Sequence, residues 1–508
     1  MIGKLRASTL RRPIVTIALV ALVGLLKVAE PLGGDQSLFL VGAHELHDGA
    51  SLYRDFWDLK QPAIYIFYFL ATSLRSYSAI AIHIFELFYL TLFSVVLIVA
   101  LRRSRSFGTV ADWVPLGAVA FYYLAAGSFE AIQVESLVAF PLFLTLFFLE
   151  AGFRAERRQR RLGFFFASGV ATAVVLAFKI IFLPIVVALW TAAIVACLPR
   201  QRSSIAFLTE AFLAAATGCA LACLLVVAFF ARAGTLEIAL QTWFALPPRI
   251  VKEIPHESIS SLLASIRWFV HRFAGMIVLA VVGTISVARR KPDAFALGAI
   301  AWLASGVFVI LIQVTSWFQY QWLLLAAPLG MLATLGVQAL YAYARSVRTP
   351  FFWRIVASLA IAVAAIALPA QMLLKDIVPL AKNGLAVTPE SRERYRDSVA
   401  PVYKALRADA RYAIGTGDVY VIGDPTFYVV SKRLQPIQLN GSSVRLFLPE
   451  QWALLERELA TARPTYIYRS HGVEIESRVA TELSANYRLV HRGVLGNLYK
   501  IKAHSVDH

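Results

Sequence analysis

Long apolar runs alternate with short basic clusters along residues 1–373 of this 508-residue chain. A helix needs roughly 17–25 mostly apolar residues to cross a bilayer. The runs that approach this length lie at 13–32, 78–101, 110–126, 134–152, 163–179, 180–198, 206–231, 270–288, 294–312, 320–341 and 353–372. The pattern therefore predicts a polytopic α-helical membrane protein with about 11 transmembrane helices.

The basic clusters follow every second run. They comprise Arg102, Arg103 and Arg105; Arg154, Arg157, Arg158, Arg160 and Arg161; Arg200 and Arg202; Arg289, Arg290 and Lys291; and Arg345, Arg348 and Arg354. All of them fall on the same side of the predicted membrane as the basic N-terminus. Because basic loops remain in the cytoplasm, we expect a cytoplasmic N-terminus and an extracytoplasmic C-terminal domain.

Two predicted outer loops are long, at residues 33–77 and 232–268. Within the first, the run 62–74 is too short to span, and its Tyr and Phe residues favour a helix lying in the interface. After the spans, 374–400 is polar and predicts a linker. Residues 401–508 then predict a small α/β domain, with strands at 419–423, 465–468 and 498–501 and an amphipathic helix at 448–462.

Composition supports a membrane protein. Hydrophobic residues make up 59% of the chain and charged residues only 16%, whereas soluble domains are about half apolar and a quarter charged. The net charge of +18 lies mainly in the loops between spans, so it does not indicate nucleic-acid binding. The three cysteines fall inside apolar runs and provide neither a disulfide framework nor metal-ligand spacing.

The first outer loop opens with an acid. Asp35 follows Gly33 and Gly34, where glycines permit a tight turn and the close approach of a ligand. A carboxylate at membrane depth is costly to desolvate, so one interpretation is a catalytic role. The alternative is that Asp35 caps the helix that follows it.

Further along this loop, Tyr53 and Asp58 precede Lys60. An ammonium group at headgroup level can bind a lipid phosphate, and the acid and the phenol beside it are candidate substrate-binding groups. The alternative is an ordinary interfacial anchor with an aromatic belt.

Three charged residues flank later spans. Glu135 opens the fourth span, and we expect it to face a cavity and not lipid. Lys179 lies between the fifth and sixth spans, where it either snorkels to the interface or binds a phosphate; we favour the phosphate. Arg249, in the second outer loop, is a further candidate for phosphate binding.

His256 and Glu257 are adjacent in the same loop, but two neighbouring residues do not specify a metal site. A divalent metal stays an open alternative, and no other cofactor is indicated. His256 is also a candidate substrate-binding residue, as is Gln319, which lies among aromatic residues at the start of the tenth span. The inner loops contain no Gly-rich phosphate loop.

These residues together carry a family likeness. The acid after the first span, followed by the segment YRDFWDLKQPAIY, resembles the polyprenol-dependent glycosyltransferases of the C-type (GT-C) fold, in particular the protein mannosyltransferase and aminoarabinose transferase group, or glycosyltransferase family 39 in a broad sense. The likeness covers about residues 10–340. Residues 401–508 resemble the periplasmic domains that such enzymes often carry.

The resemblance implies site roles. Asp35 stands at the position of the family's catalytic base, and Glu135, the second candidate catalytic residue, corresponds to its acid at the start of the fourth span. Lys60–Gln61–Pro62 matches its Lys-Pro-Pro motif with one proline replaced. The family usually has an acid pair at the first site, but Gln36 stands in the second position. This departure argues against a paired-carboxylate or metal role at that site.

The implied activity is transfer of a sugar from a polyprenyl-phosphate donor to an acceptor hydroxyl with inversion, on the outer face of a bacterial cytoplasmic (inner) membrane. The acceptor is a glycan, a lipid or a protein. Two alternatives remain open: a transporter or flippase of lipid-linked sugars, and a non-catalytic membrane assembly subunit. The enzyme hypothesis expects Asp35, Glu135 and Lys179 to line one cavity.

Overall fold

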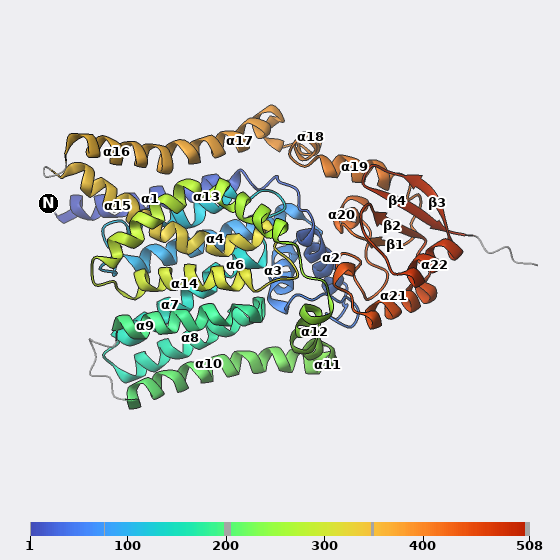
Figure 1. Cartoon of the computed structure of the whole chain (residues 1–508), viewed down its shortest axis with the longest axis horizontal. Coiled ribbons are helices and arrows are strands. Elements are labelled where there is room, and N and C mark those ends of the chain that lie inside the picture. The colour runs from blue at the N-terminus through green and yellow to red at the C-terminus, as the bar shows by residue number, and fades with distance from the viewer. Residues whose placement is uncertain (1, 76, 198–204, 347–349, 503–508) are drawn as a thin grey trace, which may run out of the picture. The chain divides into compact units, whose positions relative to one another are not determined.

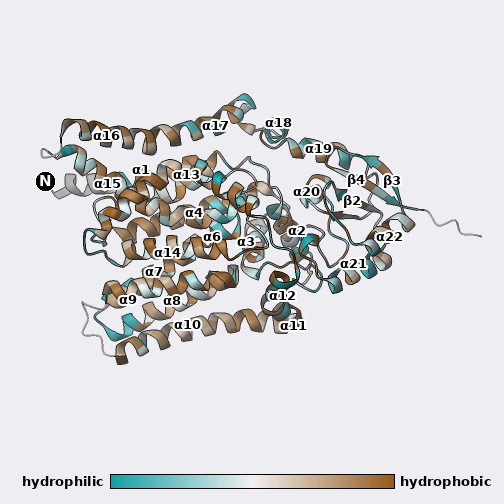
Figure 2. Cartoon of the chain, in the orientation of Figure 1, coloured by the Kyte–Doolittle hydropathy of each residue, from teal (hydrophilic) through white to brown (hydrophobic). Residues whose placement is uncertain are grey.

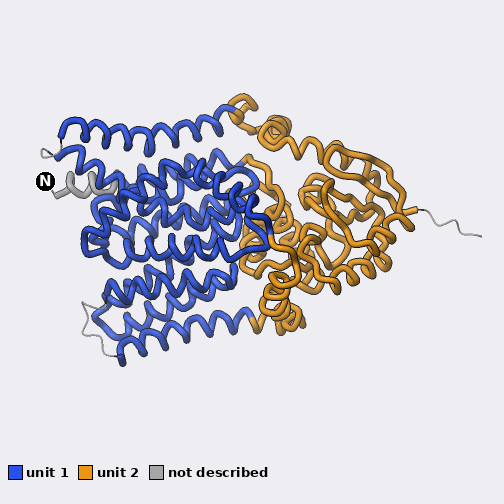
Figure 3. The backbone as a smooth tube through the Cα atoms, in the orientation of Figure 1, with its two compact units in different colours: residues 1–28, 84–226, 257–378 blue, residues 29–83, 227–256, 379–508 orange. Residues whose placement is uncertain are grey.

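The computed structural model describes residues 2–75, 77–197, 205–346 and 350–502, with the backbone alone for residues 2–10. The predicted basic positions Arg200, Arg202 and Arg348 lie outside the described residues. The chain divides into two compact units, each built from three segments (Figure 3). Unit 1 comprises Met1–Val28, Ile84–Val226 and Glu257–Val378, and unit 2 comprises Ala29–His83, Val227–His256 and Pro379–His508.

Unit 1 contains the membrane-spanning helices. Within the described residues, nine helices are long and apolar enough to cross a bilayer: Ala79–Leu101, Val134–Arg154, Arg158–Phe178, Ile180–Cys197, Ile205–Arg232, Ile259–Ala288, Ala294–Leu311, Gln319–Arg345 and Phe351–Lys382. Each coincides with a predicted span, and Figure 2 shows their predominantly hydrophobic colouring. The polytopic helical fold is thus confirmed.

Of the two remaining predicted spans, the first extends beyond the end of its helix and the second has an irregular backbone. Helix α1 (Ile2–Leu25) ends before residue 32, and the chain continues as turns and irregular structure to Gly33. The third run contains a 3-10 turn at Ala111–Trp113, a π-helical segment at Leu116–Ala120 and the short helix α5 (Phe121–Ala125).

Successive long helices of unit 1 alternate in direction, so the basic connections gather at one end (Figure 1). Helices α4 (Ala79–Leu101), α7 (Ala139–Arg154) and α15 (Ala326–Arg345) end there, and α8 (Arg158–Phe178) begins there. Close packing depends on small residues. A Cβ on Gly283 of α13 (Ile259–Ala288) would lie 2.0 Å from the carbonyl oxygen of Leu332 in α15.

Unit 2 contains a four-stranded sheet of order β1-β2-β4-β3. Strand β1 (Val419–Ile422) pairs in parallel with β2 (Tyr466–Ser470), which pairs antiparallel with β4 (Gly496–Ile501), and β4 pairs antiparallel with β3 (Tyr487–Arg492). The three predicted strands are confirmed, as is the helix, α21 (Pro449–Ala462). Strand β3 was not predicted because it is half exposed and lacks a clear apolar alternation.

Both predicted outer loops contribute to unit 2 with short helices. The first supplies α2 (Asp35–His47) and α3 (Pro62–Thr72), the latter matching the predicted run at 62–74. The second supplies α11 (Leu236–Leu240) and α12 (Leu246–Glu253).

Two predicted boundaries shift. The second loop is shorter than predicted because the hydroxyl of Ser258 caps α13 by accepting from the Ser261 amide at 3.3 Å, so the helix begins at Ile259. The predicted linker at 374–400 contains the end of α17 (Leu368–Lys382) and helix α18 (Pro389–Val399).

Candidate functional site

Asp35 and Lys60 form an ion pair in unit 2. The Lys60 Nζ lies 3.1 Å from the Asp35 Oδ2, although 25 residues separate them along the chain. Their side chains are 29% and 23% exposed, so both groups can be reached from solvent. The buried ring of Phe39 lies beneath, with its centroid 5.8 Å from Nζ. The pair therefore combines an acid and a cation, with the cation over the face of an aromatic ring.

The turn before α2 places Asp35. Gly34 occupies the cap position with φ 52° and ψ −128°, a backbone conformation that side chains rarely adopt. Asp35 is the first helical residue and not the cap, so the capping alternative does not describe its position. Its neighbour Gln36 is fully buried, and its Oε1 accepts a hydrogen bond from the Gly33 amide at 2.9 Å.

The main chain at Lys60 is fixed by Tyr53. The Tyr53 hydroxyl donates to the Lys60 carbonyl at 2.8 Å and accepts from the Trp243 Nε1 at 2.7 Å. Burial raises the pKa of Tyr53 well above its ordinary value, so the phenol keeps the proton that it donates. Tyr53 is fully buried and acts here as a positioning residue; its predicted contact with substrate remains a prediction.

Asp58 supports the same turn. One carboxylate oxygen accepts from the Leu59 amide at 2.8 Å, and the other accepts from the Tyr65 hydroxyl at 2.7 Å. Only 1% of this residue is exposed. In this arrangement Asp58 orders the chain leading to Lys60, and its predicted substrate contact is likewise untested.

Segments distant in sequence clamp the Tyr53–Lys60 turn within unit 2. The Trp57 amide donates to the Gln438 carbonyl at 2.9 Å, and the Asn440 side chain donates to the Trp57 carbonyl at 2.6 Å. The Trp57 indole donates to Thr242 at 3.2 Å. The second outer loop and the C-terminal segment thus hold the lysine-bearing turn in place.

A second charged cluster lies in unit 1. The Lys179 Nζ donates to Glu135 Oε1 at 3.0 Å and to Gln313 Oε1 at 2.6 Å. The Glu135 side chain is 2% exposed and that of Lys179 is 21% exposed. Lys179 has extended backbone between α8 and the 3-10 turn Ile180–Phe182, so its side chain projects from a break between two spans. The expectation that this cluster and Asp35 line one cavity stays a prediction.

Other predicted residues have different surroundings. Arg249 on α12 pairs with Glu253 at 3.0 Å and also with Glu450, so carboxylates already occupy its guanidinium group. A phosphate would have to displace them. Gln319 is exposed at the start of the 3-10 helix Gln319–Leu325.

The metal alternative finds little support. The His256 Nε2 lies 3.0 Å from the Val251 carbonyl, and Glu257 accepts from the Ser261 hydroxyl at 3.0 Å. Across the described parts of the chain, no group of three or more His, Cys, Asp or Glu side chains converges as a metal site requires.

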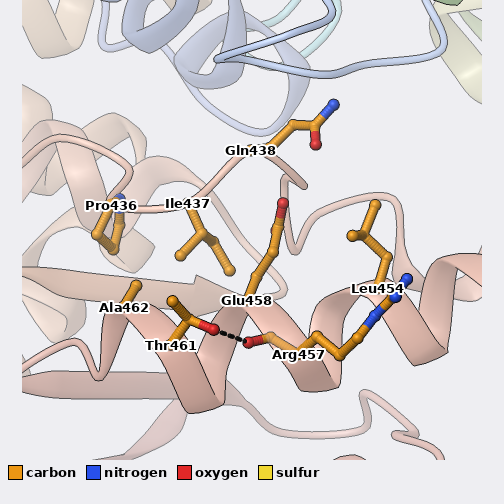
Figure 4. A pocket seen from close by; sticks show the side chains of 8 residues that line it. All are labelled: Pro436, Ile437, Gln438, Leu454, Arg457, Glu458, Thr461 and Ala462. Atoms are coloured by element: carbon orange, nitrogen blue, oxygen red, sulfur yellow. Dashed lines mark hydrogen bonds between the residues drawn. The ribbon is translucent and has the colours of Figure 1, made fainter.

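A cavity of about 490 Å³ lies in unit 2 between α21 and the segment around Ile437 (Figure 4). Its main charged groups are Arg457 and Glu458, and the Glu458 carboxylate accepts from the Leu439 amide at 3.2 Å. None of the predicted site residues lines this cavity.

Sequence reasoning missed several residues of these clusters. Gln313 and Trp243 were not singled out, and Asn440 lies in a segment that gave no functional signal. Gln313 could have been found, because an amide near the end of an apolar span requires a polar partner. The roles of Trp243 and Asn440 depend on contacts between distant segments, which no local pattern reveals.

Comparison with known proteins identifies the fold. No family model and no curated protein sequence matches the chain. A structure of ArnT from Cupriavidus metallidurans bound to undecaprenyl phosphate superposes with a TM-score of 0.60 at 14% identity, covering 97% of this chain and 98% of ArnT. Its apo state gives 0.58 at 15% identity, covering 96% and 97%. The chain therefore has the GT-C-type fold of ArnT along nearly its whole length.

Proposed function

We propose that this protein is a membrane glycosyltransferase that moves a sugar from a polyprenyl-phosphate donor to an acceptor hydroxyl. The observation that carries the proposal is the Asp35–Lys60 pair, 3.1 Å apart and accessible, on a frame of buried hydrogen bonds. The ArnT structure with bound undecaprenyl phosphate supports a lipid-phosphate donor for this fold. We place the reaction at the outer face of a bacterial cytoplasmic membrane, following the distribution of basic loops.

In the proposed reaction Asp35 is the general base. The acceptor hydroxyl gives its proton to the carboxylate as its oxygen bonds to the anomeric carbon. The bond between that carbon and the phosphate oxygen breaks, and polyprenyl phosphate leaves with the electron pair. Attack opposite the leaving group inverts the configuration.

Lys60 would bind the donor phosphate and offset the charge that develops on it. Since Lys60 is paired with Asp35 in the described arrangement, a bound phosphate competes with the carboxylate for the ammonium. Donor binding would thus free Asp35 to accept a proton. Lys179, held by Glu135 and Gln313, is the second candidate cation for the phosphate.

Transfer from a labelled polyprenyl-phosphate sugar in membranes tests this function. We expect Asp35→Asn to lower the rate about 10²- to 10⁴-fold, the usual loss when a general base is removed. Asp48→Asn is a matched control, because Asp48 follows the other end of α2 and its side chain is 53% exposed. Full transfer by Asp35→Asn would remove Asp35 from the mechanism.

The two other functional classes predict different results in the same membranes. A flippase would move the labelled lipid across the bilayer without forming a glycosylated product. An assembly subunit would show neither activity and would tolerate Asp35→Asn. Product formation that depends on Asp35 therefore separates the enzyme from both.

A further inference from the structure

A large basic hollow lies at the other end of unit 1 from Glu135. Its volume is about 940 Å³, within the range of ligand sites. Its walls come from the end of α4, the connection after it, the end of α7 and the start of α8. Glu135 and the hollow lie at opposite ends of the 21-residue helical stretch Val134–Arg154, about 30 Å apart at 1.5 Å per residue.

The charge of this hollow is positive. Four arginines line it, Arg103, Arg154, Arg157 and Arg160, against two glutamates, Glu150 and Glu156. Arg154 pairs with Glu150, and its guanidinium also donates to the Arg103 carbonyl at 3.1 Å.

Three of these arginines differ from their neighbours. Among the described residues, Arg103, Arg157 and Arg160 have no carboxylate within ion-pair distance. The adjacent Arg158 and Arg161, by contrast, both bind Glu210, at 2.5 and 2.8 Å. The loop thus neutralises part of its charge and leaves three guanidinium groups available at the hollow.

The remaining wall is apolar. It includes Phe147, Phe148 and Phe164 together with four alanines. The three phenylalanines belong to two spanning helices and are half-buried, and such side chains contact acyl chains in a membrane. Guanidinium groups beside an apolar wall at the end of a helix bundle suit a phosphate headgroup that carries lipid tails, and basic pockets between spans bind such headgroups.

We propose that this hollow binds an anionic phospholipid, with its phosphate on Arg103, Arg157 and Arg160 and its acyl chains along the phenylalanines. The site is separate from the proposed transfer chemistry and does not depend on it. The positive-inside rule assigns it to the cytoplasmic leaflet. A free anion would engage the arginines but would leave the apolar wall unused.

Native mass spectrometry of lipid binding tests the proposal, with the delipidated full-length protein as the sample. We expect phosphatidylglycerol and cardiolipin to bind and phosphatidylcholine to bind far more weakly. Each arginine near a membrane surface contributes about a five-fold change in binding. The triple variant Arg103→Gln, Arg157→Gln, Arg160→Gln should therefore bind roughly 100-fold more weakly.

The matched control is Arg289→Gln, Arg290→Gln, Lys291→Gln, which removes the same charge from another basic connection at the same end. An equal loss of lipid in the control would overturn the proposal, since diffuse charge would then explain binding. Equal binding of phosphatidylcholine would also overturn it, as would displacement of the lipid by millimolar inorganic phosphate. If the triple variant does not fold, Arg160→Gln alone should still show about a five-fold loss.

Discussion

At the scale of single residues, the candidate chemistry consists of charged groups that neutralise one another. Asp35 pairs with Lys60, and Glu135 pairs with Lys179. Removing one member leaves its partner with an uncompensated charge, and the cost is larger for the more deeply buried Glu135–Lys179 pair. A single substitution therefore measures lost function and lost pairing together. The double variant Asp35→Asn, Lys60→Met removes both charges and separates the two effects.

The acids of the C-terminal segment provide a residue-scale prediction about pH. Burial raises the pKa of Glu458 above its ordinary value of 4.5. The folded state therefore binds the proton more tightly than the unfolded state. As pH rises from the ordinary pKa through the raised one, ionisation of this group lowers the stability of the fold. We expect Glu458→Gln to raise the thermal midpoint at neutral pH, with the gain disappearing below about pH 4.5.

The pKa of Glu450 shifts in the opposite direction, so this residue serves as the control for Glu458. A hydrogen bond from Arg249 lowers the pKa of Glu450, so its stabilising contribution is present above the ordinary value and is lost as pH falls. Glu450→Gln should slightly lower the thermal midpoint at neutral pH, since exposed ion pairs contribute little. Equal midpoints for wild type and Glu458→Gln at neutral pH would contradict the account of Glu458.

At the scale of elements, the turn before α2 determines where Asp35 lies. Gly34 has φ 52°, and no neighbouring atom lies within 4 Å of a Cβ placed on it. Glycine is therefore required by the backbone conformation and not by a lack of room for a side chain. Gly34→Ala should cost about 1–3 kcal/mol of stability and lower transfer activity by displacing Asp35.

Gly163→Ala is the control for that substitution. Gly163 also has no atom within 4 Å of a Cβ, but it lies inside helix α8 without a positive φ. Alanine there should stabilise by up to about 1 kcal/mol. Thermal unfolding in detergent measures both changes, and a neutral Gly34→Ala would contradict the strain argument.

Elements were predictable from sequence where a long local pattern encodes them. The long spans and the strand at 419–423 follow from runs of apolar residues. The start of α13 was misplaced because polar residues occupy its first turns, and strand β3 was missed because it is half exposed. Asp35 and Lys60 were expected as site residues from the motif resemblance. The clamp by Gln438 and Asn440 was not, because it joins segments that lie far apart in the chain.

At the scale of the whole molecule, unit 2 is discontinuous in sequence. The C-terminal segment was predicted as a separate domain, but it forms one compact unit with both outer loops. The GT-C fold is shared with ArnT at only 14% identity over nearly the full length. A pattern of apolar helices can thus persist where individual residues have changed.

Membrane orientation is a prediction at this scale. In a background with Cys197, Cys219 and Cys223 replaced by serine, a membrane-impermeant maleimide should label Glu474→Cys in intact cells. It should label Gln159→Cys, in the basic first turn of α8, only after lysis. The reverse pattern would invert the proposed topology and move the chemistry to the cytoplasmic face.

Binding of a labelled polyprenyl phosphate to purified variants tests the central claim most directly. If Lys60 holds the phosphate in competition with Asp35, Lys60→Ala should bind roughly 10- to 100-fold more weakly, the loss expected for a charged hydrogen bond. Asp35→Asn should bind as tightly as wild type or more tightly while failing to transfer sugar. Unchanged binding by Lys60→Ala, or an equal loss in Asp35→Asn, would contradict this account.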